Sequence, residues 1–103
     1  MSERLNALKT MLDQKPDDSF LRYGFAMELG RTGALEQAVS EYRALLEQNA
    51  DYPAAYFHGG QALEKLGRLD EARAMYEAGI GVTTRLGDAH TRSELQAALD
   101  MLG

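Results

Sequence analysis

The chain reads LGRTGALEQA at residues 29–38 and LEKLGRLDEA at residues 63–72, two stretches that align at an offset of 34 residues. Between residues 29–44 and 63–78 this offset gives six identical pairs in sixteen positions. The composition alone would give about one identity by chance. The sequence therefore contains an internal repeat with a period of 34 residues.

Each repeat is predicted to form a pair of helices. Apolar residues recur at helical spacing in the second half of each repeat, and no strand-like alternation appears anywhere. Asp18 and its neighbours are good N-cap residues, and Gly33 can adopt the positive φ of a tight turn between helices. We predict helices at about 20–29, 34–48, 54–66 and 70–83, with one further helix at each end of the chain.

Glycines in the C-terminal third predict the ends of the last helices. Gly79 and Gly81 are expected to weaken the end of the helix over 70–83, and Gly87 to break the chain after it. Two starts for the final helix remain open, because Thr91 and Glu94 also form a capping-box pattern. The predicted fold class is all-α, with about six antiparallel helices.

Composition and charge exclude several classes of protein. The chain has 11 basic and 16 acidic residues and a net charge of −5, which argues against nucleic acid or an anionic membrane as a partner. It has no cysteine, so disulfides, thiolate catalysis and cysteine-ligated metals are excluded. We find no signal-peptide pattern and no apolar run of the ~18 residues that a membrane span needs, and we expect a cytoplasmic protein.

The 34-residue period and the pattern of small and large residues resemble the tetratricopeptide repeat (TPR) family. This resemblance implies a right-handed superhelix of paired helices. Three positions depart from the family pattern: Arg22 replaces a frequent aromatic, Ala50 replaces the proline seen at Pro16, and Gly79 replaces a larger residue. The residues that carry the resemblance are Ala26, Leu29, Gly33, Leu35, Ala38 and Tyr42 in the first repeat, and Tyr56, Gly60, Leu63, Gly67, Leu69, Ala72 and Tyr76 in the second.

The resemblance also implies a domain organisation. We expect one TPR-like domain over residues 1–103, in which small residues such as Ala26 and Gly60 leave room for large tyrosines. The end helices should cap the stack by covering apolar faces. The expected parts are an N-terminal half-repeat helix at 1–16, repeats at 19–52 and 53–86, and a C-terminal capping helix at 87–103.

The family's concave groove, formed by the first helix of each pair, is the candidate functional site. In this family such a groove binds an extended peptide or a helix of another protein. Aromatic residues and methionine beside basic residues would suit a peptide with apolar anchors and some acidic character. The predicted partner-binding residues are Phe20, Tyr23, Met27 and Arg31 in the first repeat, Phe57, His58, Gln61 and Lys65 in the second, and Arg92 in the last helix.

Other interpretations of the same residues stay open. Phe20, Tyr23 and Met27 of the first repeat could equally pack against the N-terminal helix. For Phe57, contact with a partner is favoured. A second hypothesis is self-association through the terminal helices, around Leu95, Leu99 and Leu102. We therefore expect a monomer or a weak homo-oligomer.

Two specific activities find little support in the residues. Family members that hold chaperone C-terminal carboxylates use lysines, asparagines and an arginine, and of the matching positions here only Arg92 fits, while Asp88 has the wrong charge. His58 and His90 lack metal-ligand spacing, and no nucleophile motif surrounds any serine. We predict no catalytic residue, no metal and no cofactor, and we find no reason to expect an enzyme or a small-ligand-binding protein.

Overall fold

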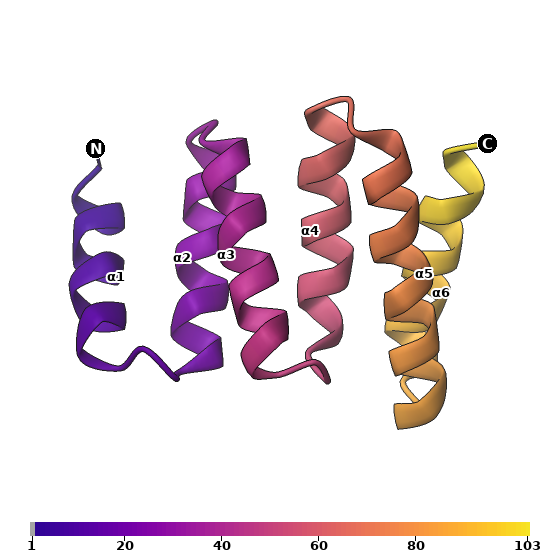
Figure 1. Cartoon of the computed structure of the whole chain (residues 1–103), viewed down its shortest axis with the longest axis horizontal. Helices are drawn as coiled ribbons and strands as arrows, with labels where there is room; N and C mark the ends of the chain where they lie inside the picture. Colours follow the sequence, from indigo (N-terminus) through magenta and orange to yellow (C-terminus); the bar gives the residue numbers. More distant parts are fainter. Residues whose placement is uncertain (1) are drawn as a thin grey trace.

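The computed structural model describes residues 2–103, which form six helices and no strand. The predicted all-α fold class is thus confirmed for this part of the chain. Successive helices run in opposite directions along a stack whose two termini lie at opposite ends (Figure 1). The helices are α1 (Glu3–Gln14), α2 (Ser19–Arg31), α3 (Leu35–Gln48), α4 (Pro53–Lys65), α5 (Leu69–Leu86) and α6 (Ala89–Met101).

The stack is curved. The backbones of α2 and α4, and those of α4 and α6, approach within 8 Å at several residues. In contrast, α3 and α5 nowhere come that close within residues 2–103, although both face the viewer in Figure 1. The first helices of the pairs therefore lie on the inner, concave side, and the second helices are splayed apart on the outer, convex side.

Local signals set most of the helix ends as predicted. The Asp18 side chain accepts a hydrogen bond of 3.0 Å from the Leu21 backbone N–H, which caps the start of α2. Gly33 has φ of 91° and closes the turn between α2 and α3. At the last helix, the Asp88 side chain accepts from the Thr91 N–H at 3.1 Å. This cap selects the earlier of the two possible starts, so the alternative cap at Thr91 is wrong.

The buried tyrosines pack against small residues, as the repeat pattern predicts. Tyr42 and Tyr76 are both buried. A Cβ atom added to Gly60 would lie 2.7 Å from Cδ1 of Tyr76, closer than two carbons can approach. The absence of a side chain at Gly60 thus allows α4 and α5 to pack with the tyrosine ring between them.

Helix α5 differs from its prediction because it continues to Leu86, three residues beyond Thr83. Gly79 and Gly81 lie inside this helix and do not end it. A Cβ atom on Gly79 would lie 2.6 Å from Cβ of Tyr56 and 2.9 Å from Cδ1 of Leu95. The expectation that Gly79 weakens its repeat is therefore incomplete, because its bare backbone is what lets α4 and α6 approach α5.

Both end helices cover apolar faces of the repeats. Leu5 and Leu12 of α1 are buried in one core cluster, and Leu95 of α6 is fully buried in the other. Leu99 and Leu102 also pack against this second cluster. The alternative hypothesis of self-association places these leucines in the contact face, and it is wrong for Leu95, which has no exposed surface.

Candidate functional site on the concave face

A hollow of about 200 Å³ lies between α2 and α4. Five of the nine predicted groove residues line it, so the hollow brings together residues of both repeats. Leu35 and Tyr42 of α3 complete the lining together with two small residues, Gly30 and Ala62. The predicted residues in the lining are Met27, Arg31, His58, Gln61 and Lys65.

An aromatic cluster adjoins this hollow. The ring of Tyr23 lies 5.8 Å from that of His58 and 5.4 Å from that of Tyr52, measured between centroids. Phe57 packs edge-on against His58 at 5.2 Å. Tyr23 and Phe57 are half-buried and each packs against a core cluster, so their rings are held in place by the fold and not by a ligand.

Four predicted groove residues lie outside the hollow: Tyr23 and Phe57 in the aromatic cluster, and Phe20 and Arg92. Phe20 is 73% exposed at the start of α2 and does not line it, so the alternative in which Phe20 packs against α1 is not what the structure shows. Arg92 lines a separate hollow of about 130 Å³ between the end of α5 and the start of α6. Met27 is 37% exposed and faces the hollow directly.

The positive charge of Arg31 is compensated within the fold. Its Nε donates a hydrogen bond of 2.9 Å to Glu28, which also pairs with Arg4 of α1 at 3.3 Å. Glu28 is only 5% exposed, and the hydrogen bond from Arg31 lowers the pKa of its carboxyl group. Arg31 therefore serves first to stabilise a buried carboxylate.

The charge of Lys65 is not compensated in this way. It occupies the place of Arg31 one period later, but Ala62 stands where the first repeat has Glu28. Within residues 2–103 no carboxylate forms an ion pair with Lys65. The hollow thus has one uncompensated cation at its rim.

The fold favours the neutral form of the His58 side chain. Burial lowers the pKa of its imidazole, Glu94 acts in the opposite direction, and Lys65 lowers it further. A neutral imidazole offers one hydrogen-bond donor and one acceptor. Next to Gln61, this residue gives the hollow two side chains that can bond a peptide backbone.

Sequence reasoning missed three contributors to this surface. Leu35 and Tyr42 are predicted only as residues of the repeat pattern, and no periodic signal shows that they also reach the hollow. Tyr52 precedes Pro53 in a connector and has no tyrosine at the matching position of the other repeat. Its tilted contact with Tyr23 depends on how the connector folds back, which a repeat pattern does not encode.

Comparison with known proteins identifies the family. The family model described as tetratricopeptide repeat matches residues 53–83. The crystal structure of a tetratricopeptide repeat domain protein from Salinibacter ruber is 34% identical with a TM-score of 0.78, covering 82% of this chain and 94% of that one. The chain belongs to the tetratricopeptide repeat family. TPR domains are generally protein–protein interaction modules without catalytic activity.

Two further TPR proteins resemble this one over most of its length. The TPR repeat-containing protein PA0015 of Pseudomonas aeruginosa is 28% identical over 98 residues, which are 95% of this chain and 93% of that protein. The TPR2B domain of yeast Sti1, in a complex with pHsp70, has a TM-score of 0.89 at 14% identity and covers 95% of this chain and 78% of its own. At that identity, the likeness shows the TPR fold alone.

Two features that would point to other functions are not found among the described residues. No group of three or more histidines, cysteines or carboxylates could hold a metal ion there. No helix in residues 2–103 is long and apolar enough to cross a membrane.

Proposed function

We propose that this TPR protein is a non-catalytic adaptor that binds a peptide or helix of a partner protein on its concave face. The observation that carries the proposal is the hollow between α2 and α4, where uncompensated Lys65 stands beside an apolar wall. The aromatic cluster around Tyr23 extends this surface with rings that are already fixed. Binding therefore costs little side-chain entropy.

The lining indicates which peptide fits. An acidic side chain would pair with Lys65, and an apolar side chain would contact Met27 and Leu35. His58 and Gln61 would bond the backbone of the peptide and fix its register. Exposed Phe20 would add a second apolar contact beyond the hollow.

The test is affinity capture from a native cell extract with the wild-type chain and matched variants, followed by mass spectrometry. Lys65→Glu reverses the free charge, and Tyr23→Ala combined with Phe57→Ala removes the aromatic wall. Lys15→Glu, at an exposed lysine that directly follows α1, is the control for the change in net charge. We expect the same partners with the wild type and the control, and their loss with the other two variants.

Circular dichroism of each variant separates loss of binding from loss of fold. A partner that is captured equally by Lys65→Glu and by the wild type would contradict the concave site. The proposal also has the protein acting as a monomer, because Leu95, Leu99 and Leu102 pack against the second core cluster. Sedimentation velocity at several concentrations tests this, and a stable dimer would contradict it.

A further inference from the structure

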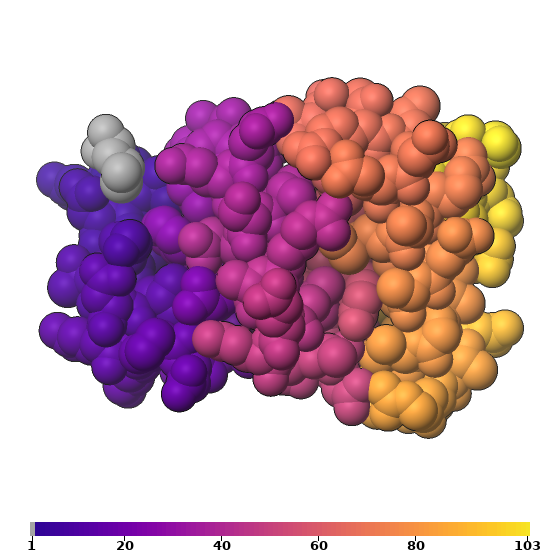
Figure 2. Space-filling model, viewed as in Figure 1, coloured from indigo at the N-terminus to yellow at the C-terminus, as the bar shows by residue number. Residues whose placement is uncertain are grey.

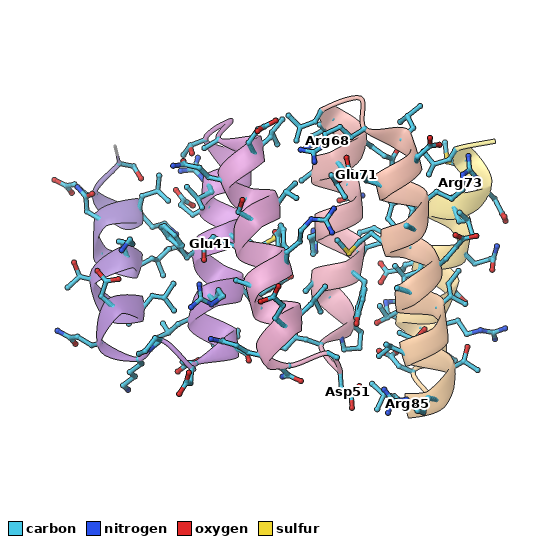
Figure 3. The ribbon with its side chains drawn as sticks, in the orientation of Figure 1. Glu41, Asp51, Arg68, Glu71, Arg73 and Arg85 are labelled. Atoms are coloured by element: carbon cyan, nitrogen blue, oxygen red, sulfur yellow. The ribbon has the colours of Figure 1, made fainter. Side chains whose placement is uncertain are left out.

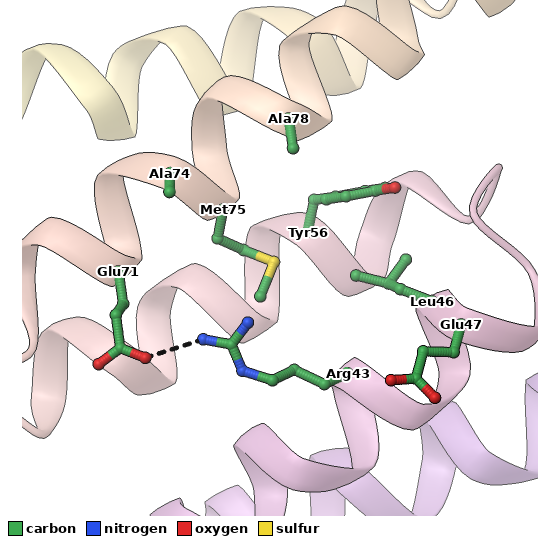
Figure 4. A pocket seen from close by; sticks show the side chains of 8 residues that line it. All are labelled: Arg43, Leu46, Glu47, Tyr56, Glu71, Ala74, Met75 and Ala78. Atoms are coloured by element: carbon green, nitrogen blue, oxygen red, sulfur yellow. Dashed lines mark hydrogen bonds and ion pairs between the residues drawn. The ribbon is translucent and has the colours of Figure 1, made fainter.

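A second and larger groove lies on the convex face, between α3 and α5. Its volume is about 560 Å³, within the range of ligand-binding sites. The buried side chains of Tyr56 and Met75 form its floor, Leu46 forms one wall, and exposed Ala74 and Ala78 form the other (Figure 4). In the space-filling view the surface is recessed between the segments of α3 and α5 (Figure 2).

This groove exists because the outer helices are splayed. The backbones of α3 and α5 do not approach each other within 8 Å, so the gap between them leaves α4 accessible from the convex face. Ala74 and Ala78 are one helical turn apart and point into this space without filling it. The Arg43–Glu71 ion pair, at 3.0 Å, spans the groove.

The preceding repeat has no such apolar groove. One period earlier, Arg22 and Glu41 occupy the places of Tyr56 and Met75, and they form an ion pair of 2.6 Å. Arg22 also donates a hydrogen bond of 3.0 Å to the carbonyl oxygen of Pro16, just as the Tyr56 hydroxyl donates one of 2.7 Å to Ala50. Arg22 thus makes the hydrogen bond that Tyr56 makes in the second repeat, but it places a charged group where Tyr56 places an aromatic ring.

The charge on the rim of the convex groove is uneven. Arg43 is paired with Glu71, which Arg68 also contacts at the top of α5 (Figure 3). Glu47, which lines the groove next to Leu46, forms no ion pair within residues 2–103. The groove therefore has an apolar floor and one uncompensated negative charge, which complements an apolar group that carries a cation.

We infer that the convex groove binds an amphipathic helix of a partner protein, with apolar side chains one turn apart and a lysine or arginine that faces Glu47. A helix fits because the groove runs between two helices, and the ridge of a third packs into such a furrow where small residues line it. The lone carboxylate selects a basic helix. This site is separate from the concave hollow and prefers the opposite charge.

The test uses a designed helical peptide as the probe. It carries leucines at positions i, i+4 and i+7 and one lysine beside them, on a background of alanine and glutamine. A second peptide has glutamate in place of the lysine. Each is titrated into the ¹⁵N-labelled full chain, and backbone NMR shifts are followed. We expect saturable shifts on α3 and α5, with the lysine peptide bound about three- to fivefold more tightly.

Two variants and two controls sharpen the result. Ala78→Gln fills the groove with a good helix former and should weaken binding at least tenfold, whereas Ala97→Gln, at an exposed alanine of α6, should leave it unchanged. Glu47→Lys should reverse the preference between the two peptides. Glu3→Lys, which makes the same charge change at an exposed residue of α1, should not.

Several results would overturn this inference. They are an absence of shifts on α3 and α5 at millimolar peptide, binding unaffected by Ala78→Gln, or a preference that Glu47→Lys leaves unchanged. If hexylamine produced the same shifts at the same concentration, the occupant of the groove would be a small amphiphile and not a helix. If the shifts grew with protein concentration alone, the occupant would be a second copy of this chain. Lys65→Glu should not weaken peptide binding, so failure here is distinct from failure of the concave site.

Discussion

Two glycines of α5, Gly79 and Gly81, should respond in opposite ways to alanine. Both lie within the helix and two residues apart, so the gain in helix propensity is the same, about 1 kcal/mol. Their surroundings differ. A Cβ atom on Gly79 would clash with Tyr56 of α4 and Leu95 of α6, whereas nothing lies within 4 Å of one on Gly81.

The steric cost at Gly79 should exceed the gain. The contact with Cβ of Tyr56, at 2.6 Å, is about 1 Å shorter than a normal carbon–carbon approach, and that atom cannot move without its backbone. Helices lie on both sides of the glycine, so α5 cannot relieve the clash by shifting. Overpacking of this kind costs about 3 kcal/mol at the upper end of its usual range. We expect Gly79→Ala to lower the free energy of unfolding by about 2 kcal/mol.

The assay is urea unfolding followed by circular dichroism at 222 nm, with thermal melting as a second measure. Gly81→Ala should raise the free energy of unfolding by about 0.5–1 kcal/mol, because only the unfolded chain and the helix propensity change. For a domain of this size, Gly79→Ala should lower Tm by about 8–16 °C. If the two variants had equal effects, or if Gly79→Ala were the more stable, the packing argument for α4, α5 and α6 would be refuted.

Three further predictions concern the ends of the stack and its titrating groups. Glu28→Gln removes the charge that links α2 to Arg4, so hydrogen exchange in α1 should be faster in the variant than in the wild type, with exchange in α3 as the reference. Equal exchange of α1 in the two proteins would contradict the role of this ion pair. The pKa of His58 is lowered in the fold, so the unfolded chain binds the proton more readily, and stability should fall as pH drops from about 6.5 through the lower folded value. An NMR titration midpoint for His58 at or above 6.5 would exclude this. Deletion of residues 88–103 exposes the surface that Leu95 covers and should strongly destabilise the domain; an unchanged melting curve would show that α6 is not a cap.

The sequence predicts the fold because the same local pattern occurs twice. The 34-residue period, the turn glycines and the capping residues are all readable in short windows. The pairing of bare Gly60 with bulky Tyr76 was also predicted, since the first repeat offers the comparison of Ala26 with Tyr42. All these features depend on the spacing of residues along the chain, which can be read directly from the sequence.

The sequence does not predict what depends on packing between repeats. Gly79 reads as a helix breaker in isolation, and only the position of α6 shows that the glycine is needed. A charged residue such as Arg43 is typical of a solvated outer face, and the groove beside it depends on the splay of α3 and α5. The compensation of Arg31 is an exception, because Glu28 lies three residues earlier and the pair could have been recognised from its spacing.

The splay of the outer helices gives the protein unequal stiffness. Along the inner rim α2, α4 and α6 are in contact, which resists compression, whereas α3 and α5 are connected through α4 and through ion pairs such as Arg43–Glu71. A small rotation of one repeat about α4 would hence change the outer spacing more than the inner one. An object wedged between α3 and α5 would limit that rotation, and so would restrict how far the inner surface can open or close.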